Sequence, residues 1–183
     1  FARLVETATG RVLLEENGFL NQAEWMPQSD LLYYTQKTAS GRELITVDPA
    51  TFAQNSLAKQ LPEGYFVFTP DEQTLLFTCE KEGPKENPDF IRVLVPDDRI
   101  EGYRNRSFLW RYDLVSGLFQ QLTFGHHSTY LNDVSADSRY LLYSTSHDDL
   151  TKVPFSTQSL YRLDLQTMTV DTLWEKRPFI MQA

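Results

Sequence analysis

The stretch that decides the fold runs from Leu109 to Gly117 and reads Leu-Trp-Arg-Tyr-Asp-Leu-Val-Ser-Gly. Aromatic side chains recur at every second position of its first half, which is the period of a half-buried β-strand. Asp113 then precedes Ser116 by three positions and Gly117 by four. A carboxylate at this spacing caps the N–H groups of a tight turn, and Gly adopts the positive φ that such a turn requires. The stretch therefore predicts a strand that ends in a short hairpin.

The same hairpin signal occurs four times along the chain. In each copy an acidic residue is followed three positions later by Ser or Thr, and an apolar or aromatic residue directly precedes the acid. The acidic residues are Glu6, Asp48, Asp113 and Asp164. Only the first and third copies continue with a glycine, Gly10 and Gly117. The repetition predicts four equivalent hairpins.

A second repeated pattern lies between these hairpins. Each copy is a strand, a polar turn and a second strand that begins Leu-Leu followed by an aromatic residue. The copies cover residues 25–33, 68–77 and 134–143. Because the two patterns alternate, the repeating unit has four strands, called a, b, c and d here, with a polar a–b turn and an acidic c–d hairpin. Four-stranded units in series are typical of the blades of a β-propeller.

The spacing of the four acids predicts where each blade begins and ends. Successive acids lie 42, 65 and 51 residues apart, whereas a propeller blade takes about 40–45 residues. The two longer spacings predict insertions between strands b and c, at 81–104 and 146–157. The predicted segments are a hairpin of a preceding blade at 1–14, blades at 18–60, 64–123 and 128–174, and the start of a later strand at 178–183.

The predicted fold class is therefore all-β, an incomplete β-propeller of about three four-stranded antiparallel blades plus an N-terminal c–d hairpin. A β-sandwich built from the same hairpins is the alternative, although a sandwich does not require a repeated sequence. Because closed rings have about 4–8 blades, and because residue 1 is Phe, we expect the chain to be part of a longer protein. The open sheet edges are expected to pair with a second copy, which would give an edge-to-edge homo-oligomer.

Composition excludes several classes of protein. The chain has 17 Lys and Arg against 25 Asp and Glu, a net charge of −8, which argues against a nucleic-acid surface. Cys79 is the only cysteine, so no internal disulfide can form. No run of about 18 apolar residues is present, so no membrane span is predicted.

The second pattern resembles the TolB-like propeller repeat, whose core reads Ser-Pro-Asp-Gly before an apolar strand. The copies in this chain lack the Gly and read Pro27-Gln28-Ser29-Asp30, Pro70-Asp71-Glu72-Gln73 and Ala136-Asp137-Ser138-Arg139. Together with residues 109–117, 121–123 and 137–144, they look like blades from the N-terminal propeller of prolyl oligopeptidase and dipeptidyl peptidase IV relatives. Similar blades occur in periplasmic Tol-associated propellers and in oligogalacturonate lyases.

The peptidase resemblance implies a non-catalytic propeller that gates access to a serine exopeptidase. The implied partners are a catalytic hydrolase domain of the same parent chain and a peptide substrate that passes the propeller. The implied location is extracytoplasmic, in the bacterial periplasm or cell envelope. The resemblance leaves two other functions open. One is a stand-alone TolB-like binding or scaffold propeller. The other is a sugar-acting propeller of the oligogalacturonate lyase kind, which would need metal-ligating His residues on several blades.

No catalytic, cofactor or metal residue is predicted in this chain. None of the eight glycines brackets a serine in the Gly-x-Ser-x-Gly spacing of a peptidase nucleophile. Ser146, His147 and Asp148 have the residue types of a catalytic triad, but neighbours in an extended chain point to opposite sides, so we expect a polar loop. His126 and His127, with His147 and Asp148, are also types that ligate zinc or nickel. Adjacent His residues, however, rarely bind the same ion.

One side of the blades is the candidate contact face. Propeller strands alternate in direction, so the b–c loops and the connections from strand d to the next strand a emerge on the same side. Both insertions and the His126-His127 segment therefore share that side, and long loops on a rigid scaffold commonly carry binding. The residues predicted for this face are Glu80, Glu82, Arg104, His126, His127, His147 and Asp148.

Overall fold

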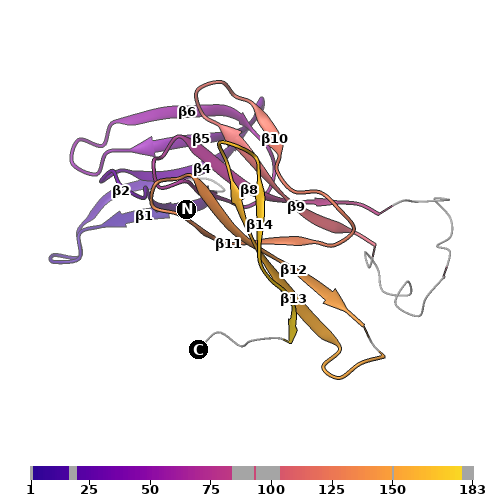
Figure 1. Ribbon diagram of the computed structural model, residues 1–183. Coiled ribbons are helices and arrows are strands. Elements are labelled where there is room, and N and C mark those ends of the chain that lie inside the picture. Colours follow the sequence, from indigo (N-terminus) through magenta and orange to yellow (C-terminus); the bar gives the residue numbers. More distant parts are fainter. Residues whose placement is uncertain (1, 17–19, 84–92, 94–103, 150, 179–183) are drawn as a thin grey trace. The chain divides into compact units, whose positions relative to one another are not determined.

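A computed structural model of the protein describes residues 2–16, 20–83, 93, 104–149 and 151–178 (Figure 1). The regular secondary structure of these residues consists of β-strands alone, which confirms the predicted all-β class. No helix in the described ranges has the length and apolar character needed to cross a membrane.

The strands form one two-stranded hairpin and three four-stranded antiparallel sheets, each made of consecutive strands. The hairpin pairs β1 (Ala2–Val5) with β2 (Val12–Glu16). The first sheet contains β3 (Leu20–Trp25), β4 (Leu32–Thr38), β5 (Gly41–Val47) and β6 (Gln54–Leu61). The second contains β7 (Phe66–Phe68), β8 (Thr74–Lys81), β9 (Arg106–Asp113) and β10 (Phe119–Gln121). The third contains β11 (Thr129–Val134), β12 (Tyr140–Asp148), β13 (Ser156–Asp164) and β14 (Val170–Pro178). Three open sheets of this order, preceded by a hairpin, confirm an incomplete propeller of blades.

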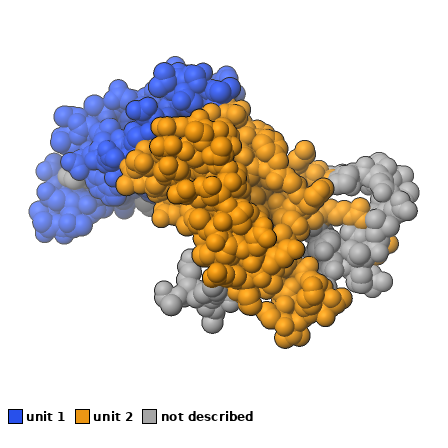
Figure 2. Space-filling model, viewed as in Figure 1, with its two compact units in different colours: residues 1–75, 112–118 blue, residues 76–111, 119–183 orange. Residues whose placement is uncertain are grey.

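The chain divides into two compact units, which Figure 2 shows in different colours. Unit 1 comprises residues 1–75 and 112–118, and unit 2 comprises residues 76–111 and 119–183. The first sheet belongs to unit 1 and the third sheet to unit 2. Each unit has its own aromatic packing, so each is described by itself.

The predicted insertion at 146–157 is shorter in the structure. β12 continues through Asp148 and β13 begins at Ser156, and these two residues pair across the hairpin. The sequence of this segment was expected to form a loop because its side chains are polar. Strand pairing, however, depends on backbone hydrogen bonds, which polar side chains do not prevent. The hydroxyls of Ser146 and Ser156 even lie 3.2 Å apart across the pair. Most of the other predicted insertion, 81–104, lies outside the described residues.

All four acidic hairpins have the predicted capping. The Asp48 carboxylate accepts the Ala50 N–H at 2.8 Å, and the Asp113 carboxylate accepts both the N–H and the hydroxyl of Ser116 at 2.7 Å. The Asp164 carboxylate accepts the Gln166 N–H at 2.8 Å. In the first copy the Thr9 hydroxyl donates to Glu6. The three-residue spacing between the acidic residue and the Ser or Thr therefore corresponds to the hydrogen bonds that cap each turn.

The residue four positions after each acid has a positive φ, whether or not it is glycine. Gly10 and Gly117 both have φ of 70°, Phe52 has 59° and Met168 has 57°. The sequence indicated this conformation only at the two glycines. At the other two copies the surrounding hairpin imposes this conformation. The backbone N–H groups of Phe52 and Met168 donate to the backbone carbonyls of Asp48 and Asp164, as those of the two glycines donate to the carbonyls of their acidic residues.

The strain at Met168 leads to a stability prediction. Non-glycine residues in the left-handed region cost about 1–2 kcal/mol, part of which the flexibility of an unfolded glycine offsets. We expect Met168→Gly to raise the free energy of unfolding by about 0.5–1 kcal/mol, measured by urea denaturation. The matched control is Gly117→Ala, where the added Cβ would meet only the Tyr112 hydroxyl at 3.7 Å. That variant should lose stability through the backbone alone, and a gain there would contradict the argument.

Asp164 also ties its hairpin to the a–b turn of the same sheet. Its carboxylate accepts two hydrogen bonds from the Arg139 guanidinium, at 3.1 and 2.7 Å. The hydrogen bond from Arg139, followed by those from the Gln166 and Thr167 N–H groups, lowers the pKa of Asp164 to about 2 against the opposing effect of burial. The turn and the hairpin are therefore joined through a carboxylate that stays ionised in moderately acidic solution.

The low pKa of Asp164 predicts how stability depends on pH. A carboxyl whose pKa is lower in the folded state contributes stability above its unfolded pKa of about 3.9, and this contribution is lost as the pH falls toward the folded value. We expect Asp164→Asn to be less stable than the wild type at pH 6, with the difference shrinking between about pH 4 and pH 2. Denaturant unfolding at a series of pH values measures this, and a difference that does not change with pH would contradict it.

Glu72 links the a–b turns of the first two sheets within unit 1. It occupies the positive-φ position of its turn, with φ of 59°, in place of the Gly of the TolB-like repeat. Its carboxylate accepts the N–H groups of Gln28 and Ser29, both at 2.7 Å, and the Ser29 hydroxyl at 3.1 Å. Burial opposes ionisation, but these hydrogen bonds lower the pKa of Glu72 overall. The lost Gly is thus replaced by a residue with a bridging role.

Aromatic residues form the core of each unit. In unit 1 Phe66 is fully buried and packs edge-on to Phe68, with ring centroids 5.9 Å apart, while Tyr33 lies 4.8 Å from Phe68. In unit 2 the ring of Trp110 stacks on that of Phe119, with centroids 4.8 Å apart, and Phe119 also packs edge-on against Phe77. Phe66, Phe68 and Phe77 are therefore core residues, whereas Trp110 and Phe119 are half-buried.

Candidate functional site

All seven residues of the predicted contact face belong to unit 2. Glu80 is an exposed residue of β8, Glu82 directly follows that strand, and Arg104 precedes β9. His126 and His127 lie in the connection from β10 to β11, and His147 and Asp148 are the last residues of β12. The seven residues therefore come from three neighbouring connections, and the structure brings some of them together.

The base of the 81–104 segment is closed by Asn105. Its side-chain oxygen accepts the Gly83 N–H at 2.9 Å, and its side-chain NH₂ donates to Glu80 at 3.0 Å. A Cβ on Gly83 would lie 2.5 Å from Arg104 Cβ, so the two sides of this base approach as closely as a glycine allows. Glu80 therefore helps Asn105 to hold the base of the 81–104 segment.

Arg106 connects this base to the histidine loop. Its guanidinium donates from Nε to the His126 carbonyl and from Nη1 to the Asn105 carbonyl, both at 2.7 Å. Sequence reasoning missed this residue, because an Arg at the start of a strand carries no pattern that distinguishes it. The only signal available was its place directly after a long insertion.

A set of buried hydroxyls fixes the other end of the histidine loop. The Thr123 hydroxyl accepts the Leu109 N–H at 2.9 Å and lies 2.7 Å from the Thr129 hydroxyl. Thr129 donates in turn to the Ser107 carbonyl at 3.2 Å, and the Ser128 hydroxyl accepts the Ser107 N–H at 3.1 Å. Residues 122–128 are therefore anchored on β9 at both ends, which holds the two histidines in place.

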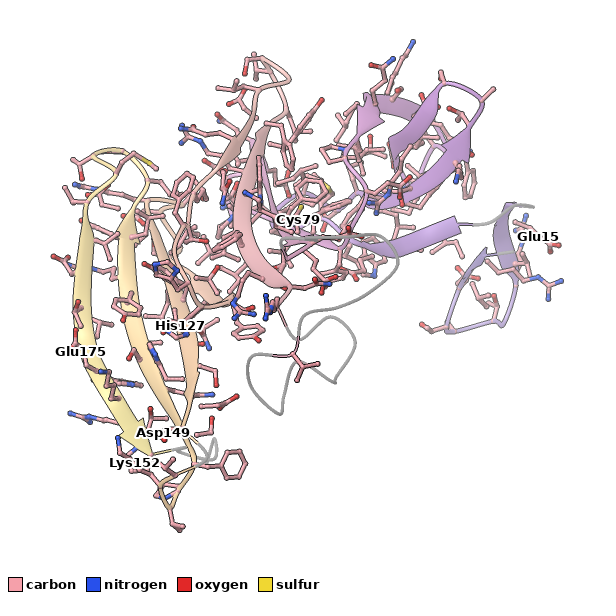
Figure 3. The ribbon with its side chains drawn as sticks, turned by 90° about the vertical axis from the view of Figure 1, so that its right-hand side faces the viewer. Glu15, Cys79, His127, Asp149, Lys152 and Glu175 are labelled. Atoms are coloured by element: carbon pink, nitrogen blue, oxygen red, sulfur yellow. The ribbon has the colours of Figure 1, made fainter. Side chains whose placement is uncertain are left out.

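His127 and His147 meet in space although they are twenty positions apart. Their ring centroids lie 4.1 Å apart with the planes tilted by 54°. The Nε2 atom of His147 lies 3.0 Å from the Thr145 hydroxyl, which orients the imidazole on its strand. Figure 3 shows His127 beside the third sheet, and Asp149 and Lys152 at the end of its β12–β13 hairpin.

The electrostatic surroundings of His127 are basic. Partial burial lowers the pKa of His127 most, and the nearby charges of His147, Arg106, His126 and Lys176 lower it further. Asp148 is exposed, and Glu80 is engaged with Asn105. Of the seven predicted residues, the structure thus brings the rings of His127 and His147 together, while Glu80 is held at the base of the 81–104 loop.

The geometry offers no catalytic triad or metal cluster in the part of the chain that the structure describes. Ser146, His147 and Asp148 are consecutive residues of β12, paired with Gln158, Thr157 and Ser156 of β13, so His147 projects from the face opposite to its two neighbours. They form a strand end where a polar loop was expected. Among the described residues, no group of three or more His, Cys, Asp or Glu side chains could hold a metal ion.

The loop between β12 and β13 carries a preformed turn. The Asp149 carboxylate accepts the Thr151 N–H at 3.1 Å and pairs with the Lys152 ammonium at 2.7 Å. The hydrogen bond from Lys152, followed by those from Thr151, lowers the pKa of Asp149 to about 2. Val153 and Phe155 are strongly exposed beside this turn.

The similarity of this chain to known proteins lies in its fold. The sequence matches no family model and no curated protein. Acylaminoacyl peptidase from Pyrococcus horikoshii is similar at a TM-score of 0.63 and 15% identity, over 94% of this chain and 27% of that one. The three sheets are propeller blades. Oligogalacturonate lyase from Vibrio parahaemolyticus matches these blades with a TM-score of 0.53 and 13% identity, over 96% of this chain and 46% of the other.

A weaker match to these blades is TolB from Acinetobacter baumannii, with a TM-score of 0.49 and 14% identity, over 93% of this chain and 36% of that one. The chain thus spans less than half the length of each of these three proteins. The matches with TM-scores of 0.63 and 0.53 support the propeller fold. At these identities the resemblance concerns the fold.

Proposed function

We propose that these blades are the non-catalytic propeller segment of a serine exopeptidase of the prolyl oligopeptidase and dipeptidyl peptidase IV kind, located outside the cytoplasm. The segment would restrict the access of peptides to a hydrolase domain of the same parent protein. The observation that carries the proposal is the alignment of 94% of this chain with about a quarter of an acylaminoacyl peptidase. The remaining three quarters of that peptidase leave room for further blades and for a catalytic domain.

The outer face of the third sheet supports the presence of a further blade. Tyr130, Ser144, Leu160 and Trp174 form one row across the four strands, because each is the direct partner of the next. Directly paired residues share a face. Ser144 and Leu160 in the middle of the row are buried, whereas Tyr130 is 48% exposed, and Trp174 is partly exposed with the Arg177 guanidinium 5.4 Å from its ring centroid. The row therefore exposes aromatic surface at Tyr130 and, in part, at Trp174. Blade-on-blade packing would bury that surface, and in the isolated chain we propose that such open sheets associate with a second copy.

The test is to express the complete reading frame that contains this segment and to label it with a fluorophosphonate probe, which reacts with activated serines. We expect one labelled serine, within a Gly-x-Ser-x-Gly motif outside residues 1–183. The 183-residue chain alone should remain unlabelled, because its Ser-His-Asp run is extended along β12. A reading frame without such a domain, or a label within residues 1–183, would overturn the proposal.

A further inference from the structure

Unit 2 contains a pair of histidines that the proposed function does not use. His127 comes from the β10–β11 connection and His147 from the end of β12, and their rings are in direct contact at 4.1 Å between centroids. Both backbones are anchored. Arg106 holds the His126 carbonyl, and His147 is paired with Thr157 across the hairpin. The backbone segments that carry the two imidazoles are therefore held by groups other than the rings themselves.

The sheet beneath these rings carries hydroxyl side chains on the same face, of which Thr129 and Ser159 are buried and support the site from below. Thr129, Thr145 and Ser159 form a row across β11, β12 and β13, because each pairs directly with the next. His147 lies two positions beyond Thr145 on β12 and so shares their face. The row ends at β14, where the backbone N–H of Lys176 donates to the Ser159 hydroxyl at 3.0 Å. The His147 imidazole and these hydroxyls thus share one face of the third sheet, and the ring of His127 contacts that imidazole.

The charged groups near this face determine whether it attracts an anion or a cation. The largest charge effects on the pKa of His127 come from His147 on β12, Arg106 on β9, His126 in its own loop and Lys176 on β14, and these four groups are basic. A cation brought to this place would be repelled by the guanidinium and the ammonium. An anion would be attracted by both and would accept hydrogen bonds from imidazole N–H groups.

We propose that His127 and His147, flanked by Lys176 and positioned by Arg106, bind an oxyanion, the carboxylate of an organic acid or a phosphate. The site lies entirely within unit 2 and does not depend on the parent protein being a peptidase. It is one positive location on a protein with a net charge of −8. Because the imidazolium form of His127 binds an anion more tightly than the neutral ring, the affinity increases as the pH falls through the lowered pKa of His127.

The experiment uses linkage between binding and protonation in the 183-residue chain. An oxyanion favours the imidazolium form, so sodium phosphate or sodium acetate should raise the titration midpoint of His127, followed by the NMR signal of its C2–H proton. Sodium chloride at equal ionic strength is the reference. A specific rise with phosphate and not with acetate identifies a phosphate site, and the reverse identifies a carboxylate site. An equal response to all three salts is ionic screening and overturns the proposal.

Variants separate the site from a general charge effect. We expect His147→Gln to weaken binding by about tenfold or more, the loss expected for one charge-assisted hydrogen bond, with Lys176→Gln giving a smaller loss. Lys152→Gln is the matched control, since the Lys152 ammonium pairs with Asp149 at the end of the β12–β13 hairpin and is not among the groups with the largest effects on the pKa of His127, and it should bind as the wild type does. Unchanged binding in His147→Gln overturns the proposal. Stoichiometric zinc binding that displaces the anion also overturns it, in favour of a metal site.

Discussion

Phe66→Ala is expected to lower the free energy of unfolding by about 3–5 kcal/mol, the range for removing a large aromatic side chain from a core. Phe66 is fully buried, lies 5.9 Å from both Tyr33 and Phe68 between ring centroids, and has the Arg42 guanidinium 5.3 Å from its own centroid. Truncation removes a ring that contacts all three of these groups, and it leaves a cavity in the core of unit 1.

The Arg42 contact makes the loss larger than burial alone would. Arg42 is itself buried and donates to the Thr35 hydroxyl at 3.2 Å and to the Pro62 carbonyl at 3.2 Å. Burial lowers its pKa, which means that its charge is held at a cost. The aromatic face of Phe66 offsets part of this cost through a cation–π interaction. Removing the ring therefore also leaves a buried guanidinium with less compensation.

The neighbouring residue provides the control for Phe66→Ala. Tyr65 is 58% exposed, so Tyr65→Ala removes an aromatic ring of similar size one position away without opening a cavity. Its effect on the free energy of unfolding should stay within about 0.5 kcal/mol. Urea denaturation monitored by fluorescence or circular dichroism measures both variants. Equal losses in the two would show that unit 1 does not pack around Phe66.

The hairpins illustrate how much of the fold could be predicted from local sequence. The spacing from Asp113 to Ser116 and Gly117 determines a turn within five residues, and the structure contains that turn at all four copies. The same reasoning could not find Phe52 and Met168 in the left-handed region, because neither residue prefers that conformation. At these two positions the paired strands on both sides enforce the turn, so the positive φ follows from strand pairing and not from the residue type.

The candidate site was predictable only in part, for a related reason. Strand alternation placed His127 and His147 on the same side of the blades, but a contact of 4.1 Å between their rings depends on loop paths that no local pattern specifies. Arg106 and Glu72 act through bonds to residues 20 and 44 positions away, and each looks like an ordinary surface charge in the sequence. The polar strand end at Ser146 was mistaken for a loop, since side-chain polarity says little about backbone pairing.

Thr123→Val is the second variant with a large expected effect, because it removes one hydroxyl from a buried network without changing the shape of the side chain. Thr123 is 5% exposed and Thr129 is 3% exposed, so neither has ready access to water. The variant leaves the Leu109 N–H without its 2.9 Å acceptor. An unsatisfied buried donor costs about 1–3 kcal/mol, and we expect a loss of that size in the free energy of unfolding.

A double-mutant cycle distinguishes this network from simple packing. Thr129→Val removes the other half of the 2.7 Å hydroxyl pair, so the two substitutions together should cost less than the sum of the single losses, with a coupling of about 0.5 kcal/mol or more. Thr172→Val, on the exposed face of β14, is the control and should change stability little. Strict additivity of Thr123→Val and Thr129→Val would contradict a shared network. Because these hydroxyls anchor residues 122–128, Thr123→Val should also change the NMR signal of His127, while Thr172→Val leaves it in place.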